Sequence, residues 1–235
     1  MPTQSRSLAG ARILVVGASG GIGRPLAAAL AGSGACLAVA GRDARKLAGI
    51  GVAEAPAFSF DLTDASASAP LVAAAAAALG GLDGVICCAG TVAFGPLDES
   101  PLEILREIVA VDLVGPLALA RAAIPVVSSG GFILNVSGVV AETPTAGLVA
   151  YSAAKAGVSA GFRALAREAR PRRISVIDAR PPHTETGLAG RPLHGEAPGM
   201  RPGLDPAGVA ERLVRAIEHD ERDVPASAFT AASAS

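Results

Sequence analysis

The stretch ILVVGASGGIG at residues 13–23 joins an apolar run to a cluster of four glycines. A continuous apolar run is typical of a buried parallel strand, and the Ala/Leu-rich residues 25–30 that follow predict a helix. Glycines at a strand-to-helix turn let the backbone approach a phosphate group, whose charge the free N–H groups of the helix start can bind. The stretch therefore predicts the first unit of a doubly wound fold, with a nucleotide pyrophosphate site at its turn.

Apolar runs alternate with helical patterns along the rest of the chain. We expect strands at 36–40, 57–60, 82–88, 132–137, 174–179 and near 224, and helices at 71–79, 100–124, 150–167 and 206–219. Ser100 and Asp205 are expected to cap the starts of the helices that follow them. This alternation predicts an α/β protein with a single-domain Rossmann fold, a doubly wound, mostly parallel sheet of about seven strands with helices on both faces.

The 235 residues suit a single domain, which we expect to occupy residues 1–225. Residues 181–206 are rich in Pro and Gly and too long for an ordinary connection, so we expect them to form a flap over the substrate. The Ala/Ser-rich residues 226–235 are expected to be a disordered tail.

Composition argues against several classes of partner. The formal net charge is −1 and no basic run is present, which argues against nucleic acid. No stretch reaches the roughly 18 consecutive apolar residues of a membrane helix, and residues 1–7 lack the layout of a signal peptide. We therefore expect a soluble, cytoplasmic protein without a membrane partner. Cys36, Cys87 and Cys88 lack a metal-type spacing with a histidine, which predicts reduced thiols and no metal site.

A second motif, YSAAKAG at residues 151–157, follows the fifth predicted strand and places Tyr151 and Lys155 on one helix face, one turn apart. With the Gly-x3-Gly-x-Gly spacing of residues 17–23, it makes almost the whole chain resemble the classical short-chain dehydrogenase/reductase family. The resemblance implies a nicotinamide cofactor and carbonyl or alcohol chemistry. It also implies cofactor contacts from Gly17, Ser19, Gly20, Gly21, Ile22, Gly23, Asp61, Leu62, Ala89, Gly90, Tyr151, Lys155, Pro181 and Thr186.

The second predicted strand ends at Gly41-Arg42. Enzymes that favour NAD usually carry an acidic residue there for the ribose 2′-hydroxyl, whereas the 2′-phosphate of NADPH needs an arginine and no acid. We therefore expect NADPH rather than NAD, with a solvated surface charge as the alternative role of Arg42, since Asp43 follows at once. Asp61 resembles the residue that meets the adenine amino group, and its alternative role is a helix cap.

The resemblance assigns proton transfer to Tyr151. An unperturbed phenol has a pKa near 10, and the Lys155 ammonium with the positive charge of the cofactor is expected to favour the phenolate. Reduction would move hydride from the nicotinamide to a substrate carbonyl while Tyr151 protonates the oxygen. Lys155 would also hold the nicotinamide ribose, and oxidation of an alcohol would be the reverse reaction.

The expected active-site serine of the family is replaced by Gly138. Loss of a hydrogen-bond donor to a developing oxyanion can cost about 10² to 10³ in rate. We therefore expect a neighbouring hydroxyl to substitute. Ser137 is the first candidate, if a bulge or strand end turns it towards the site, and the others are Thr143, Thr145 and Ser152.

Further positions also depart from the family pattern. Its helix asparagine is Asp112, which we expect to orient a water, and its Asn-Asn-Ala-Gly run begins here with Cys87-Cys88. We interpret the two cysteines as small hydrophobic residues rather than a redox pair. In the flap, His183 is a candidate substrate contact, with a surface histidine as the alternative.

These patterns predict an NADPH-dependent oxidoreductase that transfers hydride between the cofactor and a small carbonyl or alcohol substrate. Helices 100–124 and 150–167 resemble those that pair in family oligomers, so we expect a homodimer or homotetramer. The altered positions Gly138, Asp112 and Cys87 leave a second interpretation open, a nucleotide-binding protein with little or no catalysis that acts as a sensor or silent subunit.

Overall fold

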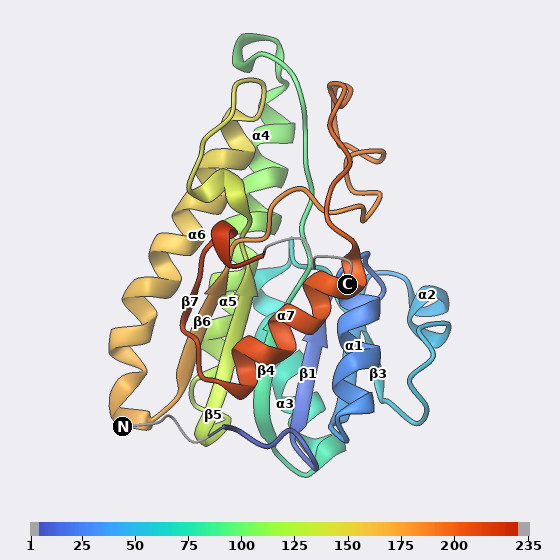
Figure 1. The fold of residues 1–235 in the computed structure, drawn as a ribbon, viewed down its shortest axis with the longest axis vertical. Helices are drawn as coiled ribbons and strands as arrows, with labels where there is room; N and C mark the ends of the chain where they lie inside the picture. The colour runs from blue at the N-terminus through green and yellow to red at the C-terminus, as the bar shows by residue number, and fades with distance from the viewer. Residues whose placement is uncertain (1–4, 230–235) are drawn as a thin grey trace, which may run out of the picture.

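The chain folds around one seven-stranded sheet in the computed structural model, which describes residues 5–229 (Figure 1). The strands lie in the order β3-β2-β1-β4-β5-β6-β7, and every neighbouring pair is parallel. Their bounds are β1 (Arg12–Val16), β2 (Cys36–Gly41), β3 (Ala57–Ser59), β4 (Leu82–Cys87), β5 (Val127–Val136), β6 (Ser175–Ala179) and β7 (Asp223–Val224). The doubly wound, seven-stranded fold that the sequence predicts is confirmed.

Helices cover both faces of this sheet, as Figure 1 shows. Their bounds are α1 (Gly23–Gly32), α2 (Ala44–Ala48), α3 (Ser68–Leu79), α4 (Leu102–Val109), α5 (Gly115–Ala123), α6 (Val149–Glu168) and α7 (Pro206–Glu218). Helices α1 and α7 pack on one face, and α3, α5 and α6 on the other. Among the described helices, none is long and apolar enough to cross a membrane.

Each face of the sheet has its own hydrophobic core, and successive strand residues pack into the two cores alternately. Ile13 and Val15 of β1 pack against the α1 and α7 side, whereas Leu14 and Val16 pack against the opposite side. Both sets are completely buried, which explains why the strand has no polar alternation in its sequence. The strand order reverses between β1 and β4, and in such sheets ligands bind at the carboxyl ends of the strands near this point.

The helix expected over residues 100–124 is interrupted. It consists of α4, a π-helical turn (Ala110–Val114) and α5. The prediction that Ser100 caps it is wrong, because the Ser100 hydroxyl donates to the carbonyl oxygen of Pro96 at 2.9 Å. The cap predicted at Asp205 is confirmed, since its carboxylate accepts from the amide of Gly208 at 3.1 Å.

Ordered structure extends beyond the expected limit at residue 225. A short 3-10 turn (Ala226–Ala228) leads to Phe229, whose ring packs in the core beside α7 with the Arg212 guanidinium 5.9 Å from its centroid. The expectation of disorder from residue 226 is therefore wrong for residues 226–229. Residues 230–235, the rest of the expected tail, lie outside the described residues.

The flap at 181–206 is tied back to the body of the protein. Thr184 pairs with Leu204 in an isolated bridge. The amide of Phe94 donates to the carbonyl oxygen of His194 at 2.9 Å. The Thr184 bridge lies within the flap, whereas the Phe94 contact and a second one, from the amide of Leu193 to the carbonyl oxygen of Val92 at 2.8 Å, tie the flap to the segment after β4.

Candidate active site

A cavity of about 520 Å³ lies at the carboxyl ends of the strands, and its volume suits a cofactor or small-molecule site. The glycine turn after β1, the ends of β4 and β5, helix α6 and the flap form its walls. The predicted site residues that line it are Gly17, Ser19, Gly20, Gly21, Ile22, Arg42, Asp61, Leu62, Ala89, Gly90, Ser137, Tyr151, Lys155, Pro181 and Thr186. Two predicted residues lie outside this lining. Gly23 is in the first turn of α1, and Asp112 is buried against Lys155.

The glycine turn is packed too closely for side chains. Gly17 has a φ of +83°, and a Cβ atom there would lie 2.6 Å from the amide nitrogen of Ala89. A Cβ on Gly23 would collide with the carbonyl group of Gly17. Within residues 5–229, no side chain caps the start of α1, so its first-turn N–H groups can bind an anion from the cavity. This cradle fits the pyrophosphate of a dinucleotide.

The flap meets the glycine turn at Thr186. A Cβ atom on Gly21 would collide with the Thr186 side chain, so the two backbones approach closely here. The Thr186 hydroxyl accepts from the amide of Leu188 at 3.3 Å. Thr186 therefore lies directly beside the pyrophosphate cradle.

Two basic side chains, Arg42 and Lys46, line the cavity at the end of β2 together with Asp43. The Asp43 carboxylate caps α2, because its Oδ1 accepts from the amides of Arg45 at 3.0 Å and Lys46 at 3.2 Å. Arg42 is exposed. Lys46 also lies close to this acid, with Nζ 3.8 Å from Oδ2 of Asp43. The acid that follows Arg42 is therefore engaged with its own helix, and Arg42 remains to face a ligand.

Asp61 follows β3 and makes a local turn rather than a helix cap. Its Oδ1 accepts from the amide and from the hydroxyl of Thr63, both at 2.9 Å. This arrangement differs from the alternative role that the sequence suggested for Asp61. It leaves the residue at the cavity wall beside Leu62.

Tyr151 and Lys155 lie one turn apart on α6, and both line the cavity. The Lys155 ammonium is 5.7 Å from the centroid of the Tyr151 ring and donates to the carbonyl oxygen of Val136 at 3.2 Å. Its Nζ also lies 3.0 Å from Oδ1 of Asp112, which belongs to the π-helical turn. Helix α6, strand β5 and the π turn thus meet at one ammonium group.

No hydroxyl occupies the place of the missing serine. Ser137 is buried, and its Oγ donates to Oδ1 of Asp178 at 2.8 Å. Gly138 has φ +123° and ψ 162°, and the nearest atom to a Cβ there would be the carbonyl oxygen of Pro181 at 3.9 Å. Ser137 therefore lines the cavity while its hydroxyl is bound to Asp178 and is not free to donate to a substrate oxygen.

The short chain dehydrogenase family model matches residues 11–196 of the chain. The chain belongs to the short-chain dehydrogenase family.

Individual relatives agree with this assignment. The chain is 34% identical to an oxidoreductase of Methylorubrum extorquens, over 78% of this chain and 79% of that protein. It is 31% identical to the glycine betaine reductase of Emericella nidulans over 94% of this chain, but it spans only 18% of that longer protein. A crystal structure of a short chain dehydrogenase from Burkholderia cenocepacia in complex with NADP superposes with a TM-score of 0.82 and 27% identity, covering 96% of this chain and 100% of that one. As a member of this family, the chain is a nicotinamide-dependent oxidoreductase.

In this short-chain dehydrogenase burial and a neighbouring charge act on Tyr151 in opposite directions. Burial raises the pKa of Tyr151, and the nearby Lys155 ammonium offsets this only in part. Burial alone would lower the pKa of Lys155, but the Asp112 carboxylate and Tyr151 together raise it. These directions favour a neutral phenol beside a charged ammonium, and the effect of Lys155 on the pKa of Tyr151 has the direction that the sequence predicts.

Three of the four hydroxyls proposed as substitutes for the family serine, those of Ser137, Thr145 and Ser152, are engaged elsewhere. Besides Ser137, the Ser152 hydroxyl accepts from the amide of Thr145 at 3.3 Å, and the Thr145 hydroxyl donates to the carbonyl oxygen of Thr143 at 3.2 Å. None of Thr143, Thr145 and Ser152 is among the described residues that line the cavity. The expectation that one of these side chains supplies the missing donor is not supported by the geometry.

The two adjacent cysteines face different sides of the sheet. Cys88 lines the cavity, while Cys87 packs in the core on the α3 side. Burial raises the pKa of Cys87 to about 11 and also raises the pKa of Cys88. A thiolate is the reactive form of cysteine, so these pKa directions support the interpretation of both residues as hydrophobic.

Sequence reasoning named His183 in the flap, but it missed other flap residues in the cavity wall. The structure places His183 there, with Nε2 3.4 Å from Oε1 of Glu185, and adds Leu188, Arg191 and Met200. The Pro/Gly composition indicated that the flap is functional, but not which of its side chains turn inwards.

Proposed function

We propose that the chain reduces a small carbonyl compound with NADPH, or oxidises the corresponding alcohol with NADP⁺. The observation that carries this proposal is that Tyr151 and Lys155 line the same cavity as the glycine turn at residues 17–23. A cofactor bound at the turn and a substrate next to Tyr151 would then be close enough for group transfer.

The preference for NADPH is supported by the end of β2. Arg42 and Lys46 line the cavity there, and the Asp43 carboxylate is engaged in capping α2. A 2′-phosphate carries negative charge that basic side chains bind and a free carboxylate would repel. The NADP complex of the Burkholderia cenocepacia relative is consistent with this choice.

NADPH, when bound, supplies the hydride that a carbonyl carbon accepts. Tyr151 donates its phenolic proton to the carbonyl oxygen, which becomes the alcohol hydroxyl. The raised pKa keeps the phenol protonated before this step. Lys155, held by Asp112 and the carbonyl oxygen of Val136, stabilises the phenolate that the transfer leaves behind. Oxidation of an alcohol reverses these steps.

Gly138 leaves Tyr151 as the principal donor to the substrate oxygen. Family enzymes with the serine have a second donor, and the loss of such a donor can cost about 10² to 10³ in rate. Turnover is therefore expected to be slow.

We also propose that the protein is a homodimer or homotetramer, because α4 and the π turn expose the apolar side chains of Leu102, Val109 and Val114. We place this oligomer in the cytoplasm. Light scattering on the purified protein tests the oligomeric state.

The test of the proposed function is NADPH oxidation over a panel of ketones and aldehydes, compared with the Tyr151→Phe variant. This variant keeps the ring and removes only the proton donor. Turnover by the native protein that the variant lacks is the expected result. Binding of NADPH without turnover above that of the variant would replace the proposal with the sensor or silent-subunit interpretation.

A further inference from the structure

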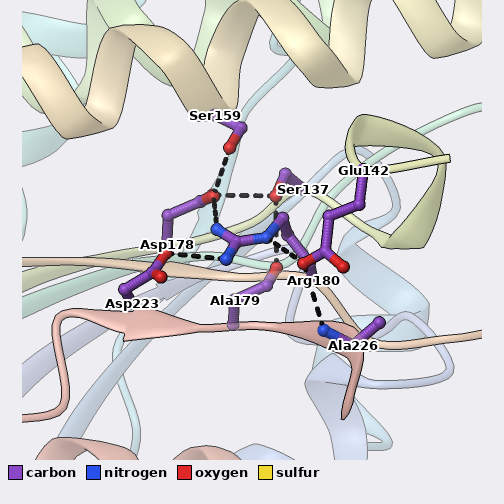
Figure 2. Close-up of polar contacts among 8 residues, drawn as sticks. All are labelled: Ser137, Glu142, Ser159, Asp178, Ala179, Arg180, Asp223 and Ala226. Carbon is purple, nitrogen blue, oxygen red and sulfur yellow. Dashed lines mark hydrogen bonds and ion pairs between the residues drawn. The ribbon is translucent and has the colours of Figure 1, made fainter. Parts of the chain in front are cut away.

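Figure 2 shows a network of charged side chains in which Asp178 and Arg180 are buried, whereas Glu142 and Asp223 are partly exposed. At its centre is Arg180, directly after β6, with a side chain only 5% exposed. Its guanidinium pairs with three carboxylates: Asp178 at 2.7 Å, Asp223 at 2.6 Å, and Glu142. One arginine thereby joins the ends of β6 and β7 to the segment that follows β5.

Asp178 extends the network to the helix that carries Tyr151. Its Oδ2 accepts from the hydroxyl of Ser159 at 2.7 Å, and its Oδ1 accepts from the hydroxyl of Ser137 at 2.8 Å. Residues 151, 155 and 159 are spaced by four on α6, so Tyr151, Lys155 and Ser159 share one helix face. The helix face of the site is therefore fastened to β6 one turn beyond Lys155.

Residues 137–142, the segment after β5, are held at both ends. Ser137 bonds Asp178 at the start, and Glu142 pairs with Arg180 at the end. The amide of Ala226 adds a further donor to Oε1 of Glu142 at 3.1 Å. Between these two anchors, Gly138, Val139 and Val140 line the cavity.

Val136 at the end of β5 contacts α6 directly, and the next residue, Ser137, is linked to α6 through Asp178. Lys155 donates to the carbonyl oxygen of Val136, and Ser137 shares the Asp178 carboxylate with Ser159. These contacts fix the spacing between the face of α6 and the backbone at Gly138, where the missing serine leaves no side chain to set it. Buried ion pairs add little net stability over apolar side chains of the same volume, so stability alone does not account for this network.

We propose that Asp178 and Arg180 are positioning residues, which hold the Tyr151 and Lys155 face of α6 against segment 137–142. This inference rests on the proposed function, because its kinetic consequence is the alignment of Tyr151 with a substrate carbonyl. Misplacement of a reacting group by about 1 Å can cost 10²-fold in rate. The network therefore acts on kcat through Tyr151, and on cofactor binding only through the single contact that Lys155 would make with the nicotinamide ribose.

The deciding variant is Ser159→Ala, which cuts the link to α6 and leaves every charge paired. Arg180→Met would leave the buried Asp178 carboxylate uncompensated and can prevent folding. The matched control is Ser68→Ala, since Ser68 is also a buried helical serine and its hydroxyl has no partner among the described residues.

The chain has one tyrosine and no tryptophan, so tyrosine fluorescence reports on Tyr151 alone. Acrylamide quenching of that fluorescence is measured without cofactor.

The expected result for Ser159→Ala is a fall in kcat of about 10- to 100-fold, with a much smaller change in the NADPH dissociation constant and with Tyr151 quenched more easily than in Ser68→Ala. A Ser159→Ala protein that matches Ser68→Ala in kcat and quenching would overturn the inference. If the native protein binds NADPH but turns over no carbonyl, the proposed function fails. The quenching comparison then still decides whether the network positions Tyr151.

Discussion

Oδ1 of Asp112 lies 3.0 Å from Nζ of Lys155, with side-chain exposures of 0% and 5%. The amide of Thr91 donates to the same carboxylate at 3.2 Å. Burial of one isolated charge is very costly, whereas a paired and hydrogen-bonded charge is tolerated. The two residues thus depend on each other, and Asp112 contacts the ammonium directly.

Replacing Asp112 tests this dependence. Asp112→Ala should lower the free energy of unfolding by about 3 to 5 kcal/mol, the usual cost of removing one partner of a buried pair. Asp112→Asn keeps an acceptor for Thr91 and should cost less. Urea unfolding measures both. In the double variant Asp112→Ala with Lys155→Met no charge is left unpaired, so its loss should be smaller than the sum of the single losses, and an additive result would contradict the coupling.

The sequence predicted Asp112 and Lys155 as site residues but not their contact. Periodicity and motif spacing place Lys155 on a helix beside Tyr151, because both signals are local. Asp112 reaches Lys155 from a π-helical turn within what looked like one continuous helix. Such a turn depends on tertiary packing rather than on a local pattern. Its approach also requires Gly90, where a Cβ atom would lie 2.8 Å from the Asp112 carboxylate.

Arg42→Asp should weaken NADPH binding. A lost charge-assisted hydrogen bond is worth about 1.5 to 3 kcal/mol, so the NADPH dissociation constant should rise about 10- to 100-fold, while NADH binding stays the same or improves. Arg45→Asp is the matched control, since Arg45 is an exposed residue of α2 outside the residues that line the cavity. Fluorescence titration with both nucleotides gives the values. An unchanged NADPH constant in Arg42→Asp would refute the 2′-phosphate assignment.

Restoring a side chain at Gly138 should destabilise the protein. Its φ of +123° and ψ of 162° lie in a region that residues with a Cβ rarely adopt, at a cost of about 1 to 3 kcal/mol. The space itself is open, so Gly138→Ser and Gly138→Ala should lose similar amounts in thermal unfolding. A Ser variant as stable as the native protein would show that the backbone relaxes easily. Any increase in kcat of Gly138→Ser over Gly138→Ala measures the contribution of the serine hydroxyl to the rate.

The alternation of strand residues explains why the serine substitute was mispredicted. Ser137 and Gly138 are neighbours in sequence, but consecutive side chains of an extended chain point to opposite sides. The sequence prediction required a bulge that turns the Ser137 hydroxyl towards the substrate, and a glycine at position 138 is compatible with such a bulge. The partner that holds Ser137 instead, Asp178, is 41 residues away. No local pattern identifies a contact at that separation.

The pH dependence should differ between the two reaction directions. Burial raises the pKa of Tyr151 above its ordinary value, so the protonated phenol persists through the neutral range. Because reduction needs the protonated form, kcat/KM for reduction should be flat between about pH 6 and 9. Oxidation needs the deprotonated form, so its kcat/KM should rise with pH over the same range. A loss of reduction with an apparent pKa near 7 would contradict the assignment of Tyr151 as the acid.

The thiols should differ sharply in reactivity. Cys36 is exposed at the start of β2, whereas burial raises the pKa of Cys87 to about 11 and also raises that of Cys88. Since the thiolate is the nucleophile, a thiol-specific disulfide reagent should modify Cys36 rapidly in the native protein and all three cysteines in denaturant. In Cys36→Ser the rapid reaction should vanish. If a cysteine of native Cys36→Ser still reacted rapidly, the result would favour a redox role for Cys88, which lines the cavity.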